Sequence, residues 1–194
     1  MKLKIGVMGS AQGPSIENQE NIRKAIELGH YIASSDCILV TGACPGLPDQ
    51  AAYGAHQAGG HVMGISPAFS EKEHTEQYKS PQDYYDVIIY TGLGLMERDI
   101  INIRSSDAII IAGGGIGSLN EFTVAYDEGK TIGILNGTGG ISDHIPEILN
   151  ICNRELNGNI VFDSDPKALV EKVIAVMKHR EFPTIEDERI LGQH

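Results

Sequence analysis

The chain alternates short runs of β-branched residues with segments of helical periodicity along its whole length. Continuous apolar strands of this kind are typical of a parallel sheet, because helices then cover both faces of the sheet. Strands are predicted at residues 2–8, 37–42, 61–66, 86–91, 107–112, 131–135 and 159–162. Helical spacing is clearest near residues 22–33, 49–58, 95–105 and 166–179. The pattern therefore predicts an α/β fold, a doubly wound parallel sheet of about seven strands.

The domain organisation predicted from the sequence is simple. The 194 residues suit one domain with a single core. We expect this domain to span residues 1–181, and residues 182–194 to form an acidic, loosely held tail. The polar segment 70–83 is the one interruption of the alternating pattern, and we interpret it as a mobile loop.

Composition argues against several classes of function. The formal net charge of −11 disfavours binding along a nucleic-acid polymer, which requires clustered Lys and Arg. It still allows a single phosphate to be held by local backbone amides. No apolar run approaches the roughly 18 residues that span a bilayer, and no secretory signal precedes the first predicted strand. We therefore expect a cytoplasmic protein without a membrane partner.

The metal-ligating residue types form no motif. Cys37, Cys44 and Cys152 contain no CxxC pair, and the histidines form no HExxH pattern. We therefore expect no disulfide framework, no metal site and no bound cofactor. Cys44 lies in a glycine-rich turn, where we predict a small buried residue in preference to a reactive thiol.

Three of the predicted strands end in glycine-rich turns. The first strand is followed by Gly9 and Ser10, the second by Gly42 and Gly46, and the fifth by the run 113–118. Parallel strands present their carboxyl ends at one edge of the sheet, so we expect the three turns to lie together there. One such turn indicates little, because tight turns favour glycine, but three indicate the close approach of a ligand.

The third of these turns has the properties of an anion site. Backbone amides at the start of the following helix can converge on a phosphate, and missing side chains let it approach the chain closely. The candidate residues for this contact are Gly114, Gly115, Ile116, Gly117 and Ser118. Their spacing matches neither the G-x-G-x-x-G fingerprint nor the P-loop. The run therefore predicts phosphate binding without a standard dinucleotide or nucleoside-triphosphate motif.

Two charged residues near this turn have two interpretations each. Glu121 fits a capping box with Ser118, in which the glutamate caps its own helix. It can instead supply a carboxylate to a ligand site, and Arg98 favours that interpretation. Arg98 follows the fourth strand, and an arginine beside a glycine turn suits a phosphate. The alternative for Arg98 is a surface residue paired with Glu97 or Asp99.

These motifs resemble those of the LOG (Lonely Guy) family, long labelled "possible lysine decarboxylase". The segment GGGIGSLNE resembles the family signature P-G-G-x-G-T-x-x-E, and MERD falls on its M-x-x-R-K region. TGACPGLPDQ resembles G-G-G-x-x-G-L-M-G, and VMGSAQG resembles the opening C-G-S-S-x-G. The resemblance covers roughly residues 5–134. It implies a Rossmann-like fold in a divergent branch of a superfamily that also includes molybdenum-cofactor carrier proteins.

The resemblance also implies a function and a site. LOG enzymes hydrolyse the N-glycosidic bond of a nucleoside 5′-monophosphate to free base and ribose 5-phosphate, and they are usually dimeric. Arg98 and Glu121 align with the catalytic arginine and glutamate of the family. The implied phosphate- and nucleotide-binding residues are Gly9, Ser10, Gly42, Gly46, Met96, Gly114, Gly115, Ile116, Gly117 and Ser118. We expect a homodimer or higher homo-oligomer that binds a nucleoside monophosphate or a related phosphorylated small molecule.

Departures from the family pattern leave a second function open. Asp99 stands where LOG enzymes have lysine, Gly113 replaces the signature proline, and Ser118 replaces the threonine. The alternative is a carrier that binds a nucleotide or the pterin of the molybdenum cofactor without turnover, and Asp99 favours it. Lysine decarboxylase activity is not expected, because no lysine lies at a glycine-rich strand end where it could hold pyridoxal phosphate.

Overall fold

The computed structural model describes residues 1–181, so the predicted acidic tail at 182–194 lies outside the described residues. Within residues 1–181, seven strands form one parallel sheet in the order β4-β3-β2-β1-β5-β6-β7. The strands are β1 (Lys4–Gly9), β2 (Ile38–Thr41), β3 (His61–Ser66), β4 (Val87–Tyr90), β5 (Ala108–Ala112), β6 (Thr131–Leu135) and β7 (Ile160–Asp163). The predicted α/β fold is confirmed, and each strand lies within a predicted segment or overlaps it closely.

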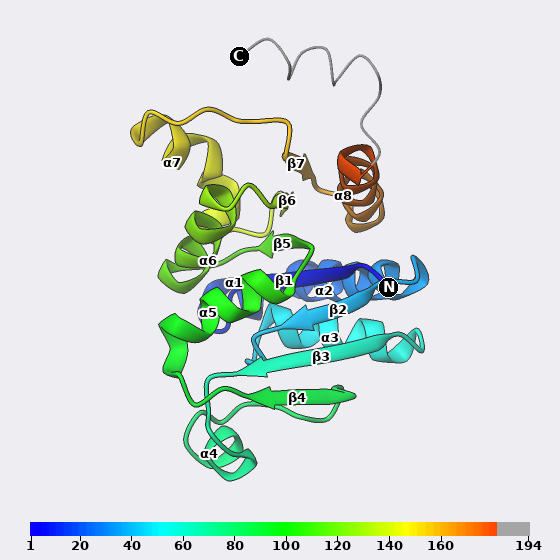
Figure 1. The fold of residues 1–194 in the computed structure, drawn as a ribbon, viewed down its shortest axis with the longest axis vertical. Coiled ribbons are helices and arrows are strands. Elements are labelled where there is room, and N and C mark those ends of the chain that lie inside the picture. Colours follow the sequence, from blue (N-terminus) through cyan, green and yellow to red (C-terminus); the bar gives the residue numbers. More distant parts are fainter. Residues whose placement is uncertain (182–194) are drawn as a thin grey trace.

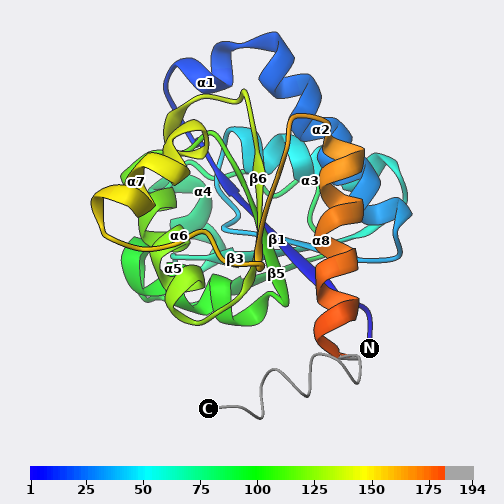
Figure 2. The ribbon, with the colours of Figure 1, turned by 90° about the horizontal axis from the view of Figure 1, so that it is seen from above.

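Helices cover both faces of the sheet. The helices are α1 (Pro14–Glu17), α2 (Gln19–Ser34), α3 (Leu47–Gln57), α4 (Glu71–Glu76), α5 (Gly94–Ser105), α6 (Ile116–Asp127), α7 (Ile145–Ile151) and α8 (Pro166–Glu181), with a 3₁₀ helix η1 (Gly140–His144). Helices α2, α3 and α8 cover one face, and α5, α6 and α7 cover the other (Figures 1 and 2). Two hydrophobic clusters fill the spaces between the sheet and these two layers.

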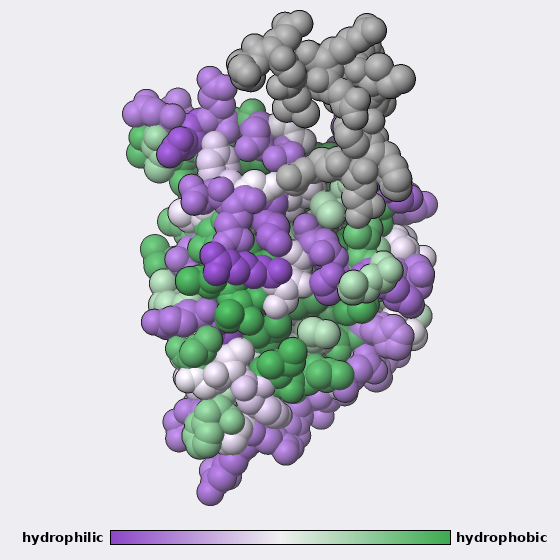
Figure 3. Space-filling model, viewed as in Figure 1, coloured by the Kyte–Doolittle hydropathy of each residue, from purple (hydrophilic) through white to green (hydrophobic). Residues whose placement is uncertain are grey.

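The sheet is buried at its centre and partly bare at one edge. Strands β5 and β6 are buried along their whole length, as expected for strands with helices on both sides. The edge strand β4 instead exposes Val87 and Ile89, and the adjacent helix α5 exposes Leu95, Met96 and Ile101. Figure 3 shows apolar side chains gathered on this side of the molecule. We call these five residues the β4–α5 face.

The prediction of a mobile loop at residues 70–83 is wrong, because the segment contains α4. Ser70 caps this helix, with its Oγ accepting a hydrogen bond from the amide of Glu73 (3.3 Å). His74 is fully buried, bonded to Ser66 Oγ through Nδ1 (2.9 Å) and to the Pro81 carbonyl through Nε2 (3.0 Å). The helix spans only six residues and buries only its histidine, so no apolar periodicity marks it in the sequence.

The direction in which strands are added to the sheet reverses between β1 and β5. Strands β2, β3 and β4 extend the sheet on one side of β1, and β5, β6 and β7 extend it on the other. In open α/β sheets the crevice for a ligand lies at the carboxyl ends of the strands at such a switch point. Gly9 ends β1 here, and a Cβ at this position would overlap the carbonyl oxygen of Ala112 at the end of β5. The glycine therefore lets the two strand ends lie close together beneath the crevice.

Candidate functional site

Two adjoining cavities occupy the carboxyl edge of the sheet. The inner cavity, of about 320 Å³, lies beside α5 and the first turns of α6. Its lining comprises Val7, Met8, Gly9, Ala11, Gly42, Cys44, Pro48, Leu95, Met96, Arg98, Asp99, Gly117, Ser118 and Glu121. The outer cavity, of about 720 Å³, is lined by Gly9, Ser10, Ala11, Gln12, Pro14, Ser15, Gly114, Gly115, Ile116, Gly117, Ser118, Gly139 and Gly140. The two cavities share Gly9, Ala11, Gly117 and Ser118.

The structure brings eleven of the twelve predicted site residues into these two cavities, because β2, β1 and β5 are neighbours in the sheet. The expectation that three glycine turns lie at one edge is therefore confirmed. Gly46 is the exception, since it lines neither cavity. It lies behind the first turn, where the amide of Leu47 donates to the Ser10 carbonyl (2.9 Å) and a Cβ on Gly46 would overlap that carbonyl oxygen.

The first two glycines of the run after β5 shape the turn. Gly113 and Gly114 have φ angles of +66° and +100°, a region that other residues rarely adopt. Their amides are held from two sides: Gly113 donates to Thr138 Oγ1 (2.8 Å) and Gly114 donates to Ser10 Oγ (2.7 Å). This fixes the direction in which the chain enters α6.

The next residues present free amides to the cavities. The first backbone bond of α6 runs from the amide of Leu119 to the Gly115 carbonyl (2.9 Å), so the amides of Ile116, Gly117 and Ser118 precede it. A Cβ at Gly115 or Gly117 would meet no atom within 4 Å, and neither residue has a positive φ. These two glycines are not required by the turn, and they leave bare backbone where an anion could approach.

The capping-box interpretation of Glu121 is wrong. Helix α6 begins at Ile116 with Gly115 as its N-cap, so Ser118 and Glu121 lie too far into the helix to form such a box. The Glu121 side chain instead lines the inner cavity and is only 7% exposed. The sequence pattern S-x-x-E places the N-cap at Ser118, three residues after the observed N-cap Gly115, which is within the usual uncertainty of a sequence-based boundary.

The carboxyl group of Glu121 is held in its neutral form. Its pKa is raised to about 8, mainly by burial and to a smaller extent by the nearby carboxylate of Asp99. The positive charge of Arg98 and a hydrogen bond from Asn102 oppose this shift without cancelling it. At neutral pH the group is therefore mostly protonated and can donate as well as accept a hydrogen bond.

Arg98 lies inside the protein, so the alternative of a surface arginine is wrong in position, although the pairing with Asp99 that it included is observed. Its side chain is about 6% exposed, and its Nη2 lies 3.5 Å from Asp99 Oδ1. Asp99 is positioned in turn by Asn120, whose Nδ2 donates to Asp99 Oδ2 (3.2 Å). The Nε and Nη1 atoms of Arg98 are buried without any hydrogen-bond partner among the described residues. Nη1 lies directly against the Cα of Gly42.

A fourth glycine-rich strand end also contributes to the site and is missing from the sequence-based prediction. The segment NGTGG, residues 136–140, follows β6, and its Gly139 and Gly140 line the outer cavity. The amides of Ile141 and Ser142 donate to the carbonyls of Gly114 and Gly113 (2.9 and 3.0 Å). The glycine content of residues 136–140 could have identified this turn from the sequence, because it is rich in glycine like the other three turns.

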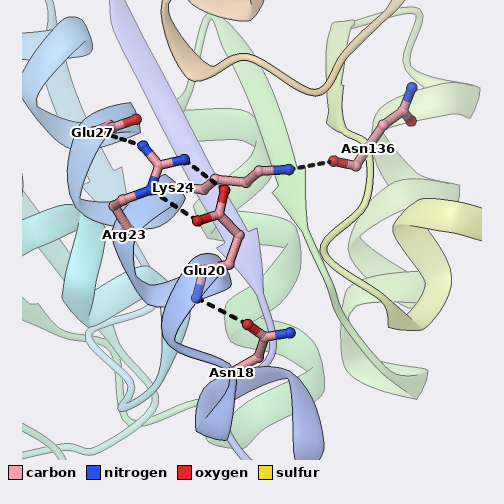
Figure 4. A network of polar contacts seen from close by, with 6 residues as sticks. All are labelled: Asn18, Glu20, Arg23, Lys24, Glu27 and Asn136. Atoms are coloured by element: carbon pink, nitrogen blue, oxygen red, sulfur yellow. Dashed lines mark hydrogen bonds and ion pairs between the residues drawn. The ribbon is translucent and has the colours of Figure 1, made fainter.

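Helix α2 holds this fourth turn in place. Asn21 is buried, and its Nδ2 donates to the carbonyls of Ser15 (3.1 Å), which lines the outer cavity, and of Thr138 (3.0 Å), which precedes the lining residue Gly139. One turn later, Lys24 Nζ donates to the carbonyl of Asn136 (3.2 Å), as Figure 4 shows. No sequence pattern distinguishes Asn21, because a single asparagine in a helix has no characteristic spacing.

Comparisons with known proteins agree with this architecture. A family model described as the SLOG cluster4 family matches residues 2–170. The chain belongs to the SLOG cluster4 family. An uncharacterized protein of Archaeoglobus fulgidus is 34% identical over 136 residues, which cover 70% of this chain and 82% of the relative. The predicted kinship with LOG-related, Rossmann-like proteins is thereby confirmed.

Several solved structures resemble this SLOG protein. The molybdenum cofactor binding protein of Rippkaea orientalis is 30% identical, with a TM-score of 0.74 and coverage of 91% of this chain and 98% of that one. The molybdenum cofactor carrier protein of Chlamydomonas reinhardtii is 28% identical, with a TM-score of 0.72 and coverage of 92% and 99%. DNA processing protein A of Helicobacter pylori, 17% identical with a TM-score of 0.59 and coverage of 89% and 80%, shares the fold alone.

The remaining side chain with reactive potential in the inner cavity of this SLOG protein is Cys44. Burial is the main cause that raises the pKa of its thiol to about 11, although the charge of Arg98 acts in the opposite direction. The thiol is therefore protonated at neutral pH and a weak nucleophile.

No helix within residues 1–181 has the length and apolar character needed to cross a membrane.

Proposed function

We propose that this SLOG protein binds a phosphorylated small molecule with a ring system of the nucleotide or pterin type, and that it holds this ligand without chemical turnover. The phosphate would contact the free amides of Ile116, Gly117 and Ser118, and the ring would enter the inner cavity beside Arg98 and Glu121. Two cavities that share one wall support a ligand with two such parts.

The observation that carries this proposal is that two nitrogens of the buried Arg98 guanidinium, Nε and Nη1, have no hydrogen-bond partner among the described residues. A buried donor without an acceptor costs about 1–3 kcal/mol, and more when it belongs to a charged group. Native structures rarely keep such groups unless a ligand, ion or water satisfies them. Arg98 lines the inner cavity, so a ligand acceptor there would relieve the cost once a small movement of the guanidinium turned Nε or Nη1 toward it.

The molybdenum cofactor is the specific ligand that we propose. It is a pterin that carries a phosphate, so it has a ring for the inner cavity and an anion for the amides. The similarity to the Rippkaea orientalis and Chlamydomonas reinhardtii proteins, at 30% and 28% identity over nearly the whole of each chain, supports this choice. The protein would act as a carrier, with the cofactor as its cargo.

Hydrolysis of a nucleoside 5′-monophosphate is the second candidate. It is favoured because Arg98 and Glu121, which align with the catalytic pair of LOG enzymes, line the same cavity. The electrostatics favour it less. An oxocarbenium-like transition state is stabilised by an anionic carboxylate, whereas the pKa of Glu121 is raised to about 8. Asp99 also neutralises part of the positive charge of Arg98, which weakens the attraction of Arg98 for a substrate phosphate.

The test uses the purified full chain and has two arms. In the first, the protein is purified from a host that makes the molybdenum cofactor, and bound molybdenum and pterin are measured by elemental analysis and by pterin fluorescence. In the second, AMP, GMP, CMP, IMP and isopentenyl-AMP are tested for binding by calorimetry and for release of free base. Bound pterin, or nucleotide binding without base release, supports the carrier. Base release supports the hydrolase.

Two arginines of α5 give a matched pair of variants. Arg98→Met removes the buried guanidinium, whereas Arg104→Met removes an exposed one that pairs with Glu128 (2.7 Å). We expect the first to lose ligand binding and the second to keep it. Equal binding by both variants would contradict the proposed site, and the absence of every ligand in both arms would contradict the proposed function.

Assembly is also proposed. We infer a homodimer or higher homo-oligomer, because the β4–α5 face leaves a contiguous group of apolar side chains exposed. Light scattering coupled to size exclusion tests this, and a monomer at micromolar concentration would contradict it.

A further inference from the structure

The free amides lie between the two cavities rather than at the end of one. Gly117 and Ser118, whose amides precede the first hydrogen bond of α6, line both cavities, as do Gly9 and Ala11. A phosphate held by these amides would therefore sit at the junction. The ring of the ligand would extend from the phosphate into the inner cavity, and the outer cavity would remain on the other side.

The outer cavity is too large to serve a terminal phosphate alone. At about 720 Å³ it exceeds the inner cavity and falls within the size range of a complete ligand site. A monophosphate at the junction would leave most of it unfilled. The volume thus indicates that a second group of the ligand lies beyond the phosphate.

The lining of the outer cavity indicates what this second group is. It contains no charged side chain, and its side-chain polar groups come from Ser10, Gln12, Ser15 and Ser118. Ile116 stands at its rim with 80% of its surface exposed, where it can pack against a ring. Hydroxyl groups and backbone suit a sugar, and an apolar rim suits its ring or an attached heterocycle. A second anionic end group would find no cation here.

The place in the fold agrees with this geometry. The two cavities flank the switch point between β1 and β5, and doubly wound sheets bind dinucleotides across the crevice at such a point. The glycine run lacks the standard dinucleotide spacing, because Ser118 stands in the position of the third glycine. The shape of the crevice, rather than that fingerprint, therefore indicates the class of ligand.

We propose that the phosphate of the ligand is internal: it links a ring in the inner cavity to a sugar or second nucleoside in the outer cavity. The ligand class is a diphosphate-bridged nucleotide conjugate, which includes the nucleotide-linked form of a pterin. This inference rests on the proposed function, because it assumes the same phosphate contact and the same inner cavity. It adds that a mononucleotide occupies only part of the site.

The test compares ligands that differ only beyond the diphosphate. Calorimetry on the full chain measures binding of ADP against ADP-ribose, GDP against GDP-mannose and UDP against UDP-glucose, with AMP, GMP and UMP beside them. We expect at least one conjugate to bind about tenfold or more tightly than its own nucleoside diphosphate. Nucleotides that bind as tightly as their conjugates throughout the panel would overturn the inference and leave the proposed function intact. No binding by any member would overturn the inference, whereas the proposed function would stand or fall with the measurement of bound pterin.

A variant that narrows the outer cavity separates the two parts of the site. Ser15→Phe places a ring in the outer cavity, and Ser34→Phe places the same ring on the exposed surface of α2. In Ser15→Phe, the conjugate should lose its advantage and bind no more tightly than its nucleoside diphosphate, whose own affinity should stay within about twofold. Ser34→Phe should retain the advantage. An undiminished advantage in Ser15→Phe, in a protein with unchanged circular dichroism, would overturn the inference.

Discussion

The guanidinium of Arg98 occupies the space that a side chain on residue 42 would need. A Cβ added to Gly42 would overlap Nη1 of Arg98. The three atoms nearest to this Cβ position all belong to the guanidinium. The φ of Gly42 is not in the positive region, so the backbone itself would accept another residue. Gly42 is thus required by a side chain of the site and not by the turn.

Gly42→Ala should therefore disturb binding more than stability. The new methyl group would push the flexible end of Arg98 aside, and we expect ligand affinity to fall about tenfold while the free energy of unfolding changes by about 1 kcal/mol. Calorimetry and urea denaturation measure the two effects. Gly158→Ala, at a glycine with open space around it, is the control. Unchanged affinity in Gly42→Ala would show that the position of Arg98 does not matter for binding.

Glu121→Gln should stabilise the protein in a manner that depends on pH. Below the ordinary pKa of 4.5 the carboxyl group is protonated in the folded and unfolded chains alike, so the variant gains little. As pH rises further, the unfolded chain ionises while the folded chain holds its proton up to a pKa of about 8, and the wild type loses stability. The variant avoids this loss, so its advantage should grow between pH 4.5 and about 8 and then level off. Its size should be on the order of a few kcal/mol.

Chemical denaturation of both proteins at pH 5, 7 and 9 measures this advantage. Other partly buried carboxyl groups, such as that of Asp49, are present in both proteins, so their titration largely cancels in the difference. A difference in stability that does not change with pH would contradict the raised pKa of Glu121.

Gly115→Val should remove the phosphate contact and leave the fold intact. The φ of Gly115 is negative (−121°), and a side chain there would meet open space, where we place the phosphate. We expect the affinity for nucleotides to fall by about a hundredfold, because several charge-assisted hydrogen bonds from the amides would be lost. Nucleosides without phosphate should bind the variant and the wild type equally. A nucleotide affinity that stays the same by calorimetry would argue against this anion site.

Asn21→Ala should weaken both stability and binding. Its side-chain amide joins the carbonyls of Ser15 and Thr138, so the substitution removes one partly buried and one buried hydrogen bond. We expect a loss of about 1–3 kcal/mol, mainly from the buried Thr138 carbonyl. Ser15 and the turn at residues 136–140, both of which contribute to the outer cavity, would then be free to separate. Asn18→Ala is the matched control on the same helix, because it removes only an exposed cap on the amide of Glu20 (2.9 Å) and should cost about 1 kcal/mol. Only the variant at position 21 should lose affinity for the ligand.

The sheet and most of the site could be predicted because they depend on patterns that are local in sequence. Continuous apolar strands fix the number of strands and their parallel arrangement, and glycine-rich strand ends then have to meet at one edge. Arg98 and Glu121 were found through their spacing in a family motif. Helix α4 could not be predicted in this way, because it has no apolar pattern in the sequence. One buried histidine and an N-cap hold it in place.

The environment of the site residues could not be predicted. The sequence places Glu121 near a cavity but gives no measure of its burial, which is what raises its pKa to about 8. The contact between Arg98 and Gly42 joins two residues 56 positions apart, and the bond from Asn21 to Thr138 spans 117 positions. Such contacts depend on how the helices cross the sheet, and no local pattern encodes them.

The glycines after β5 fall into two kinds, and this has a consequence for how the protein can evolve. Gly113 and Gly114 have backbone angles that folding itself requires, whereas Gly115 and Gly117 have room for a side chain. A homologue that keeps the fold but no longer binds the ligand is expected to retain Gly113 and Gly114 and to accept other residues at positions 115 and 117. A side chain at either residue of the second pair would block the ligand and spare the fold, so a homologue with side chains at both positions is expected to have lost this phosphate contact.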